Sequence, residues 1–397
     1  MAKKFELTAE LNLQSPKNVD KVLREIQRKI KSPSVELKFK GAKQAAKDVN
    51  EVAKANKNLK KETEAASKAA AALGKQLGSA LKNVLRYDIA RRVFYTFASA
   101  IEQGVKDAIS FEREIIKIKQ VSQGTEKELN KLQRTITGVS TSLGISSSSL
   151  VKTGLILKQT GLTVKDTDLA LRALAKTELA PTFGSIADTA ETAVAAMRQF
   201  KIEAKDLEGL LDKINVVAAN FAIESEDIGV AIKRAGGAFS SAGGQIDELI
   251  ALMTSVRSTT RETAETIATG FRTIFTRLQR PTTIKFLRQF GIELTDLEGK
   301  FIGPFKAVEK LNNALANLDP SDLRFSAIVE QLGGFRQVSK VIPLIKEFDV
   351  AQQAMNKQMR ASGSLTRDSE TAQEALSVRV KQLSEEIKAL FRSFTES

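Results

Sequence analysis

The side chains that could carry chemistry in this chain are few in kind. Among its 397 residues there is no histidine and no cysteine. This excludes Ser-His-Asp and Cys-His nucleophile systems, imidazole- or thiolate-bound zinc, and disulfides, and leaves only carboxylate, lysine or tyrosine chemistry. The acidic residues have the spacing of ordinary solvent-exposed helix faces, and the sequence pattern indicates no pair of carboxylates that would be brought together. A carboxylate-only enzyme therefore stays a remote alternative.

Glycine-rich loops offer no cofactor site either. The one glycine-dense stretch holds Gly236-Gly237 and Gly243-Gly244. Neither pair is followed by the Lys-Ser/Thr of a phosphate-binding loop, and no predicted strand precedes them as a dinucleotide fingerprint requires. We therefore expect no enzyme activity, no cofactor and no bound metal.

The charge is strongly positive and uneven. The formal net charge is +14, and residues 1–61 hold 14 Lys and 2 Arg against 7 acidic residues, a local net charge of +9. Such an N-terminal arm can attract nucleic acid, an anionic membrane or an acidic protein. A plainly solvated helix face is an equally good interpretation. No apolar leader and no run of about 18 apolar residues is present, so we expect a soluble, unsecreted chain.

The N-terminal third divides into two predicted parts. In residues 1–40, apolar and polar residues first alternate, then follow helical spacing after Pro16, and then alternate again. This pattern predicts a small β-α-β unit with parallel strands. Residues 41–110 predict a long, basic, Ala/Lys-rich helical region with a weak heptad seam, or a solvent-exposed charged helix.

Residues 111–348 predict a core of short helices. Helix starts are indicated by capping-box spacing at Thr125, Thr163, Ser185 and Thr259, each with an acid three residues later. The stretches around 144–163 and 223–244 predict two copies of a helical hairpin about 78 residues apart. The fold class is thus mainly α, with elongated helices around a bundle of short ones.

The most distinctive local pattern lies at 290–347. Brief alternation around a turn at Gly299 predicts a short β-hairpin near 291–302. Pro304 suits the first position of a helix, and Gly333-Gly334 suits a left-handed helix end. A small folded unit with no special role explains the same pattern. We take these four residues as structural, so their replacement is expected to disturb assembly.

Residues 349–397 predict a helical exit into a coiled coil. Its apolar residues step by four and three, at Leu376, Val380, Leu383, Ile387, Leu390 and Phe394. The heptad pattern continues to within three residues of Ser397, and no Gly or Pro marks a helix end there. We therefore expect a truncated helix, with a frayed natural terminus as the alternative.

The block from about 85 to 397 resembles the core of the tail tape measure proteins of long-tailed bacteriophages. The matching pieces are patterns, not a catalytic signature. They include GISSSSL with KQTGLT, SIADTAETAVAAMRQF, SEDIGVAIKRAGGAF, IELTDLEGKF with SAIVEQLGGFRQVSKVIPLI, and the final RASGSLTRDSETAQEALSVRVKQLSEEIKALF.

The resemblance implies a structural protein that sets tail length, templates tube assembly in the tube lumen and leaves ahead of the DNA. It implies contact with the tail tube protein, tail tip or baseplate proteins and assembly chaperones, and self-association in a few copies, for which a trimer is one option. DNA contact through the basic arm and membrane contact at ejection are further options. The implied location is the virion tail, in the lumen or at the tip, and the host cytoplasm during assembly. The alternatives are a basic helical nucleic-acid-binding protein and a non-phage coiled-coil scaffold.

Overall fold

The computed structural model describes residues 110–122, 124–315, 318–319 and 321–395, and two short strands nearer the N-terminus. Strands β1 (Leu7–Glu10) and β2 (Leu37–Lys40) pair in parallel, with Leu7 opposite Leu37. The helix predicted between them and the helical region at 41–109 lie outside the described residues. The β-α-β unit as a whole therefore stays a prediction.

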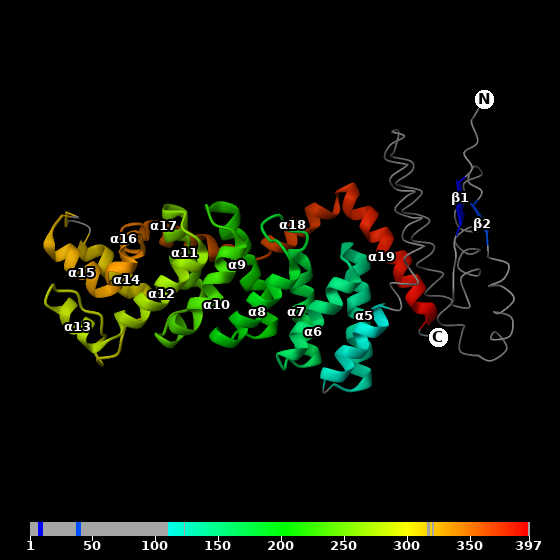
Figure 1. Cartoon of the computed structure of the whole chain (residues 1–397), viewed down its shortest axis with the longest axis horizontal. Coiled ribbons are helices and arrows are strands. Elements are labelled where there is room, and N and C mark those ends of the chain that lie inside the picture. Colours follow the sequence, from blue (N-terminus) through cyan, green and yellow to red (C-terminus); the bar gives the residue numbers. More distant parts are fainter. Residues whose placement is uncertain are drawn as a thin grey trace, which may run out of the picture. The chain divides into compact units, whose positions relative to one another are not determined.

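The chain forms two compact units (Figure 1). Unit 1 is Met1–Lys152 with Gln373–Ser397, and unit 2 is Thr153–Ala372. Unit 1 contains α5 (Glu126–Leu143), the start of α6 (Ser147–Gln159) and α19 (Leu376–Thr395). A helical stretch at 110–121 precedes α5.

Unit 2 is built from successive short helices. In chain order they are α7 (Val164–Thr177), α8 (Ile186–Phe200), η1 (Ala204–Asp206), α9 (Leu207–Asn220), α10 (Ser225–Ser241), α11 (Ile246–Thr260), α12 (Ala264–Leu278), α13 (Pro281–Arg288), α14 (Pro304–Leu315), α15 (Leu323–Gly333), η2 (Phe335–Gln337), α16 (Val338–Lys346), α17 (Phe348–Gln358) and α18 (Ser364–Gln373). The helices from α7 to α15 follow one another along the unit, and α17 and α18 run back toward α7 (Figure 1). The mainly α fold class is confirmed. None of the described helices is both long and apolar enough to cross a membrane.

Side-chain caps begin three of the helices at the predicted residues. The hydroxyls of Thr125, Thr163 and Ser185 accept the backbone N–H three residues on, at the starts of α5, α7 and α8. The prediction at Thr259 is wrong. Its hydroxyl donates to the carbonyl of Ser255 inside α11, which ends at Thr260 and is followed by Arg261 in a left-handed conformation with φ 55°.

The core of unit 2 is centred on the packing of α10 against α12. Phe239 of α10 meets Phe275 of α12 edge-on, with ring centroids 4.7 Å apart. Phe271 lies one turn before Phe275 at 5.1 Å. All three rings are fully buried, and burying an aromatic ring is among the largest single contributions a core residue makes.

The two predicted helical hairpins are spaced by about 80 residues, and their second helices, α7 and α11, begin 82 positions apart. α10 begins at Ser225, 78 positions after α6 begins at Ser147, and α12 begins at Ala264, 78 positions after α8 begins at Ile186. The first helix of each copy and the helix that follows the hairpin therefore keep a spacing of 78 positions, whereas the helix between them does not.

The hairpin predicted near 291–302 forms only in part. The chain reverses around Gly299 with one antiparallel bridge between Thr295 and Phe301, and the backbone N–H groups of Asp296 and Ile302 donate to the carbonyls of Lys300 and Leu294. Pairing over so few residues does not extend into strands, and the Asp296 carboxylate also accepts the N–H groups of Glu298 and Lys300 at the tip of the turn. At the start of the predicted C-terminal exit, α17 packs on α9 and α11 inside unit 2. The exit into a coiled coil over 349–397 stays a prediction.

Candidate functional site: a polar clasp on the returning chain

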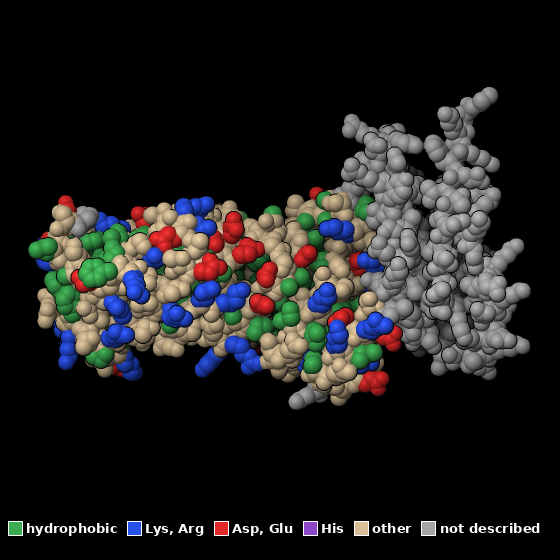
Figure 2. Space-filling view, in the orientation of Figure 1, with side chains coloured by type: hydrophobic (Ala, Val, Ile, Leu, Met, Phe, Trp, Pro, Cys, Tyr) green, Lys and Arg blue, Asp and Glu red, His purple; other side chains and the backbone are tan. Residues whose placement is uncertain are grey.

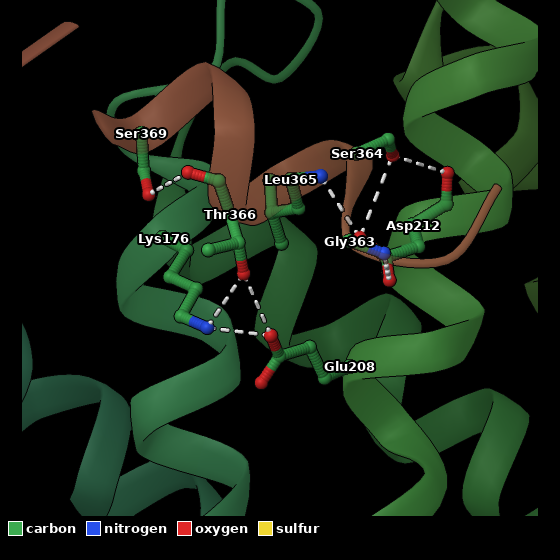
Figure 3. Close-up of polar contacts among 8 residues, drawn as sticks. All are labelled: Lys176, Glu208, Asp212, Gly363, Ser364, Leu365, Thr366 and Ser369. Carbon is green, nitrogen blue, oxygen red and sulfur yellow. Dashed lines mark hydrogen bonds and ion pairs between the residues drawn. The ribbon is translucent and has the colours of Figure 1, made fainter. Parts of the chain in front are cut away.

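The returning segment of unit 2 is held by side chains of α9. Asp212 has an exposed fraction of only 4%, and its carboxylate accepts the backbone N–H groups of Gly363 and Leu365, each at 2.8 Å (Figure 3). These N–H groups belong to the start of α18, where the first turn of a helix has no internal acceptor. The Ser364 hydroxyl donates to the backbone carbonyl of Asp212 at 3.0 Å. Asp212 thus acts as a helix cap supplied from about 150 residues away.

Two more polar residues of α9 extend this contact along α18. Glu208 accepts from Lys176 of α7 and from the Thr366 hydroxyl, and Lys176 also donates to that hydroxyl at 2.9 Å (Figure 3). Asn215 donates to Asp368 at 2.7 Å. Glu208, Asp212 and Asn215 lie at steps of four and three, on one face of the helix. We call these three residues, with the start of α18, the α18 clasp.

Unit 1 holds its own C-terminal helix with a buried carboxylate. Glu385 of α19 has an exposed fraction of 4%; it accepts the Ser140 hydroxyl at 2.8 Å and the backbone N–H of Ser147 at 3.3 Å. Ser147 begins α6, so Glu385 caps that helix from α19. Arg392 donates to the Ser147 hydroxyl at 2.7 Å and lies 4.6 Å from the centre of the Phe111 ring.

Gly144 lets α5 and α19 approach closely. It ends α5 in a left-handed conformation, φ 70°, which favours glycine. A Cβ atom here would also stand 2.9 Å from the backbone nitrogen of Gln382 and from the carbonyl oxygen of Val378, both in α19. Two independent constraints therefore require glycine at this position.

The predicted coiled-coil seam lies in α19. Leu383 and Ile387 are buried and Val380 is half-buried, in a helix that packs on α5 of the same chain. Leu376, Leu390 and Phe394 belong to the same helix, but their side chains lie outside the described set. Val378, Glu385 and Arg392 are also buried, although they do not belong to the predicted seam positions. A coiled coil between copies stays a prediction.

The four predicted structural residues lie where the chain turns or where helices begin and end. Gly299 has φ 80° in the turn, and Pro304 is the buried first residue of α14. Gly334 ends α15 with φ 62°, and its N–H donates to the carbonyl of Glu330 at 2.7 Å. Gly333 is the last residue of α15, where a Cβ atom would stand 2.7 Å from Cγ2 of Val341. The structure does not bring these four residues into the α18 clasp.

The turn near Gly299 is tied to α13 by an ion pair. Arg288 contacts Glu293 with a nitrogen–oxygen distance of 2.8 Å. Hydrogen bonds from Arg288 and Thr295 to the carboxylate hold the pKa of Glu293 at about 2, so it is ionised at neutral pH.

Among the residues that the structure describes, no group of three His, Cys, Asp or Glu could hold a metal ion. The polar groups above cap helices and join segments.

The sequence pattern contained a partial signal for the α18 clasp. Apolar residues of α9 mark its buried face, and hydrogen-bonding side chains at 208, 212 and 215 form a second stripe at helical spacing. That stripe predicts a polar contact, but nothing local identifies its partner at 363–368. The carboxylate of Glu385 was missed for the same reason, because its partners lie about 240 residues earlier.

A model of the phage-related minor tail protein family matches residues 133–334. The match begins within α5 and ends just after α15, so it includes α9 with its clasp residues and the aromatic core of α10 and α12. It also covers all four predicted structural residues. No solved structure matches this chain.

Proposed function

Because this chain belongs to the phage-related minor tail protein family, we propose that it is a tail tape measure protein. Family membership makes it a structural component of a phage tail. The proposal adds that the chain lies in the tube lumen, sets the length of the tail, templates tube assembly and leaves ahead of the DNA. Its partners would be the tube protein, tip or baseplate proteins and assembly chaperones, with a few copies of the chain together.

The family match over 133–334 carries this proposal. Helical architecture supports it, since a helix converts residue number into length at about 1.5 Å per residue. The two alternatives are a nucleic-acid-binding protein and a coiled-coil scaffold unrelated to phage. The positive charge is compatible with both, but the scaffold does not agree with the family match. A nucleic-acid-binding protein remains the second candidate, favoured by the net charge of +14.

Cysteine labelling of intact virions tests whether the chain lies in the lumen. These 397 residues contain no cysteine, so an introduced thiol is the one labelled site among them, and its label is read on this protein's own band after gel separation from the other virion proteins. Lys127→Cys in α5 and Gln352→Cys in α17 replace exposed residues, one in each unit. We expect both thiols to resist a bulky maleimide in intact tails, because the tube wall excludes the reagent, and to react after the tails are dissociated.

The purified variants serve as the control, since each thiol must label readily in the free chain. Rapid labelling of both positions in intact tails would place the chain outside the lumen and would contradict the tape measure proposal.

A further inference from the structure

One stretch of unit 2 concentrates positive charge without nearby acids in the chain. Between Glu265 and Glu293 there is no acidic residue, and the cations are Arg272, Arg277, Arg280, Lys285 and Arg288. Arg288 is paired with Glu293. For the other four, no ion pair with a described residue is formed. Figure 2 shows Lys and Arg side chains gathered around α13, at the end of unit 2 that is farther from α7.

Three arginines belong to the segments that meet near the loop after α15. A Cβ atom on Gly334 would stand 3.2 Å from Nη1 of Arg277, so the Arg277 guanidinium lies against the backbone of that loop. Arg280 follows at the start of α13, and its N–H donates to the carbonyl of Arg277. Arg336 is exposed in η2, two residues after Gly334. Packing of α15 against both α12 and α13 keeps these parts together.

An aromatic ring is presented to solvent in the same loop, directly before Arg336 in the chain. Phe335 has an exposed fraction of 86%, although the other phenylalanines of α10, α12 and α15 are buried. Its loop is ordered by specific contacts, because Gly334 donates to Glu330 at 2.7 Å and Gly333 packs on Val341. The outward position of Phe335 is therefore a feature of the folded loop. We name Arg277, Arg280, Phe335 and Arg336 the Arg–Phe surface.

We propose that the Arg–Phe surface binds nucleic acid, with the three guanidinium groups on backbone phosphates and the Phe335 ring stacked on an unpaired base. Guanidinium groups match the geometry of phosphate oxygens and donate paired hydrogen bonds to them. An exposed aromatic ring beside a basic surface is the arrangement by which proteins bind single strands without reading their sequence. This proposal is independent of the tape measure function and does not involve the basic N-terminal arm.

The surface fits nucleic acid better than a membrane. A helix that lies on a membrane needs an apolar face directed outward, whereas α13 directs Thr283 and Leu287 into the protein. The cations are also mainly arginine. An acidic protein is the other class of partner with suitable charge, and competition by poly-glutamate distinguishes it from nucleic acid in the test below.

Fluorescence anisotropy with the full chain tests the proposal, using a labelled single-stranded oligonucleotide and a duplex of the same length. We expect Phe335→Ala to weaken single-strand binding about fivefold to a hundredfold and to leave duplex binding nearly unchanged. Replacing Arg277, Arg280 and Arg336 together by Gln should weaken both, and should reduce the slope of log affinity against log salt by about 2.

The matched control replaces three exposed cations of unit 2 that lie elsewhere, Lys165, Lys310 and Arg360, by Gln. It removes the same charge and keeps the N-terminal arm, so its salt slope should fall by clearly less. Circular dichroism must show that every variant is folded. Equal losses in the two triple variants would overturn the proposal, and so would competition by poly-glutamate as strong as that by the oligonucleotide, or unchanged single-strand binding by Phe335→Ala.

Discussion

Phe275→Ala is expected to lower the free energy of unfolding of unit 2 by about 3–5 kcal/mol. The Phe275 ring is fully buried and contacts the rings of Phe239 and Phe271, so its removal leaves a cavity and also breaks two aromatic pairs. Since α10 and α12 form the most extensive helix contact in the unit, the loss should reach both helices. Denaturant unfolding of the full chain, with hydrogen exchange followed in α10 and α12, measures it.

Two variants bracket this result. Phe275→Leu keeps most of the buried volume and should cost less than about 2 kcal/mol. Phe335→Ala removes the same ring from an exposed position and should leave unfolding nearly unchanged. If Phe275→Ala unfolded at the same denaturant concentration as Phe335→Ala, the aromatic contact of α10 with α12 would not be the core of the unit.

Asp212→Ala is expected to release α18 from α9 at a cost of about 2–4 kcal/mol. The change deprives the N–H groups of Gly363 and Leu365 of their acceptor, and each buried unsatisfied group costs about 1–3 kcal/mol. It also removes a negative charge from the positive end of a helix. Hydrogen exchange should therefore accelerate first at the start of α18, while α10 and α12 stay protected.

Asp212→Asn keeps the size of the side chain and changes only its charge and its hydrogen-bonding groups, so it separates the loss of the helix cap from the loss of packing. The amide has one acceptor oxygen and can serve one of the two N–H groups, while its own N–H₂ group faces the other donor. We expect an intermediate loss, with exchange at one of Gly363 and Leu365 still slowed. Exchange at α18 that is as slow in Asp212→Ala as in the natural chain would show that the carboxylate does not hold this segment.

Local features were the most predictable from the sequence. The caps at Thr125, Thr163 and Ser185 depend on residues three positions apart, which the pattern displays directly. Thr259 has the same spacing, yet α11 continues past it to Thr260 and α12 begins only at Ala264. The spacing alone does not say whether a preceding helix has already ended.

Long-range contacts were not predictable, because their two halves lie far apart in the chain. Asp212 shows hydrogen-bonding capacity at a helical position, but its partners lie about 150 residues later. The period of α19 predicted that Leu383 and Ile387 lie on one face, and both are buried. It could not show that α5 of the same chain packs on that helix.

The proposal that chain length sets tail length is tested most directly by measuring tails. Residues 49–76 form whole heptads of the predicted helical region, which lies outside the described residues, and removing them in the phage's own gene deletes about 28 residues. If each residue contributes about 1.5 Å, electron microscopy should show tails shorter by about 40 Å. A scrambled helical sequence of equal length in the same place should restore the original length. Intact tails of unchanged length after the deletion would contradict the account.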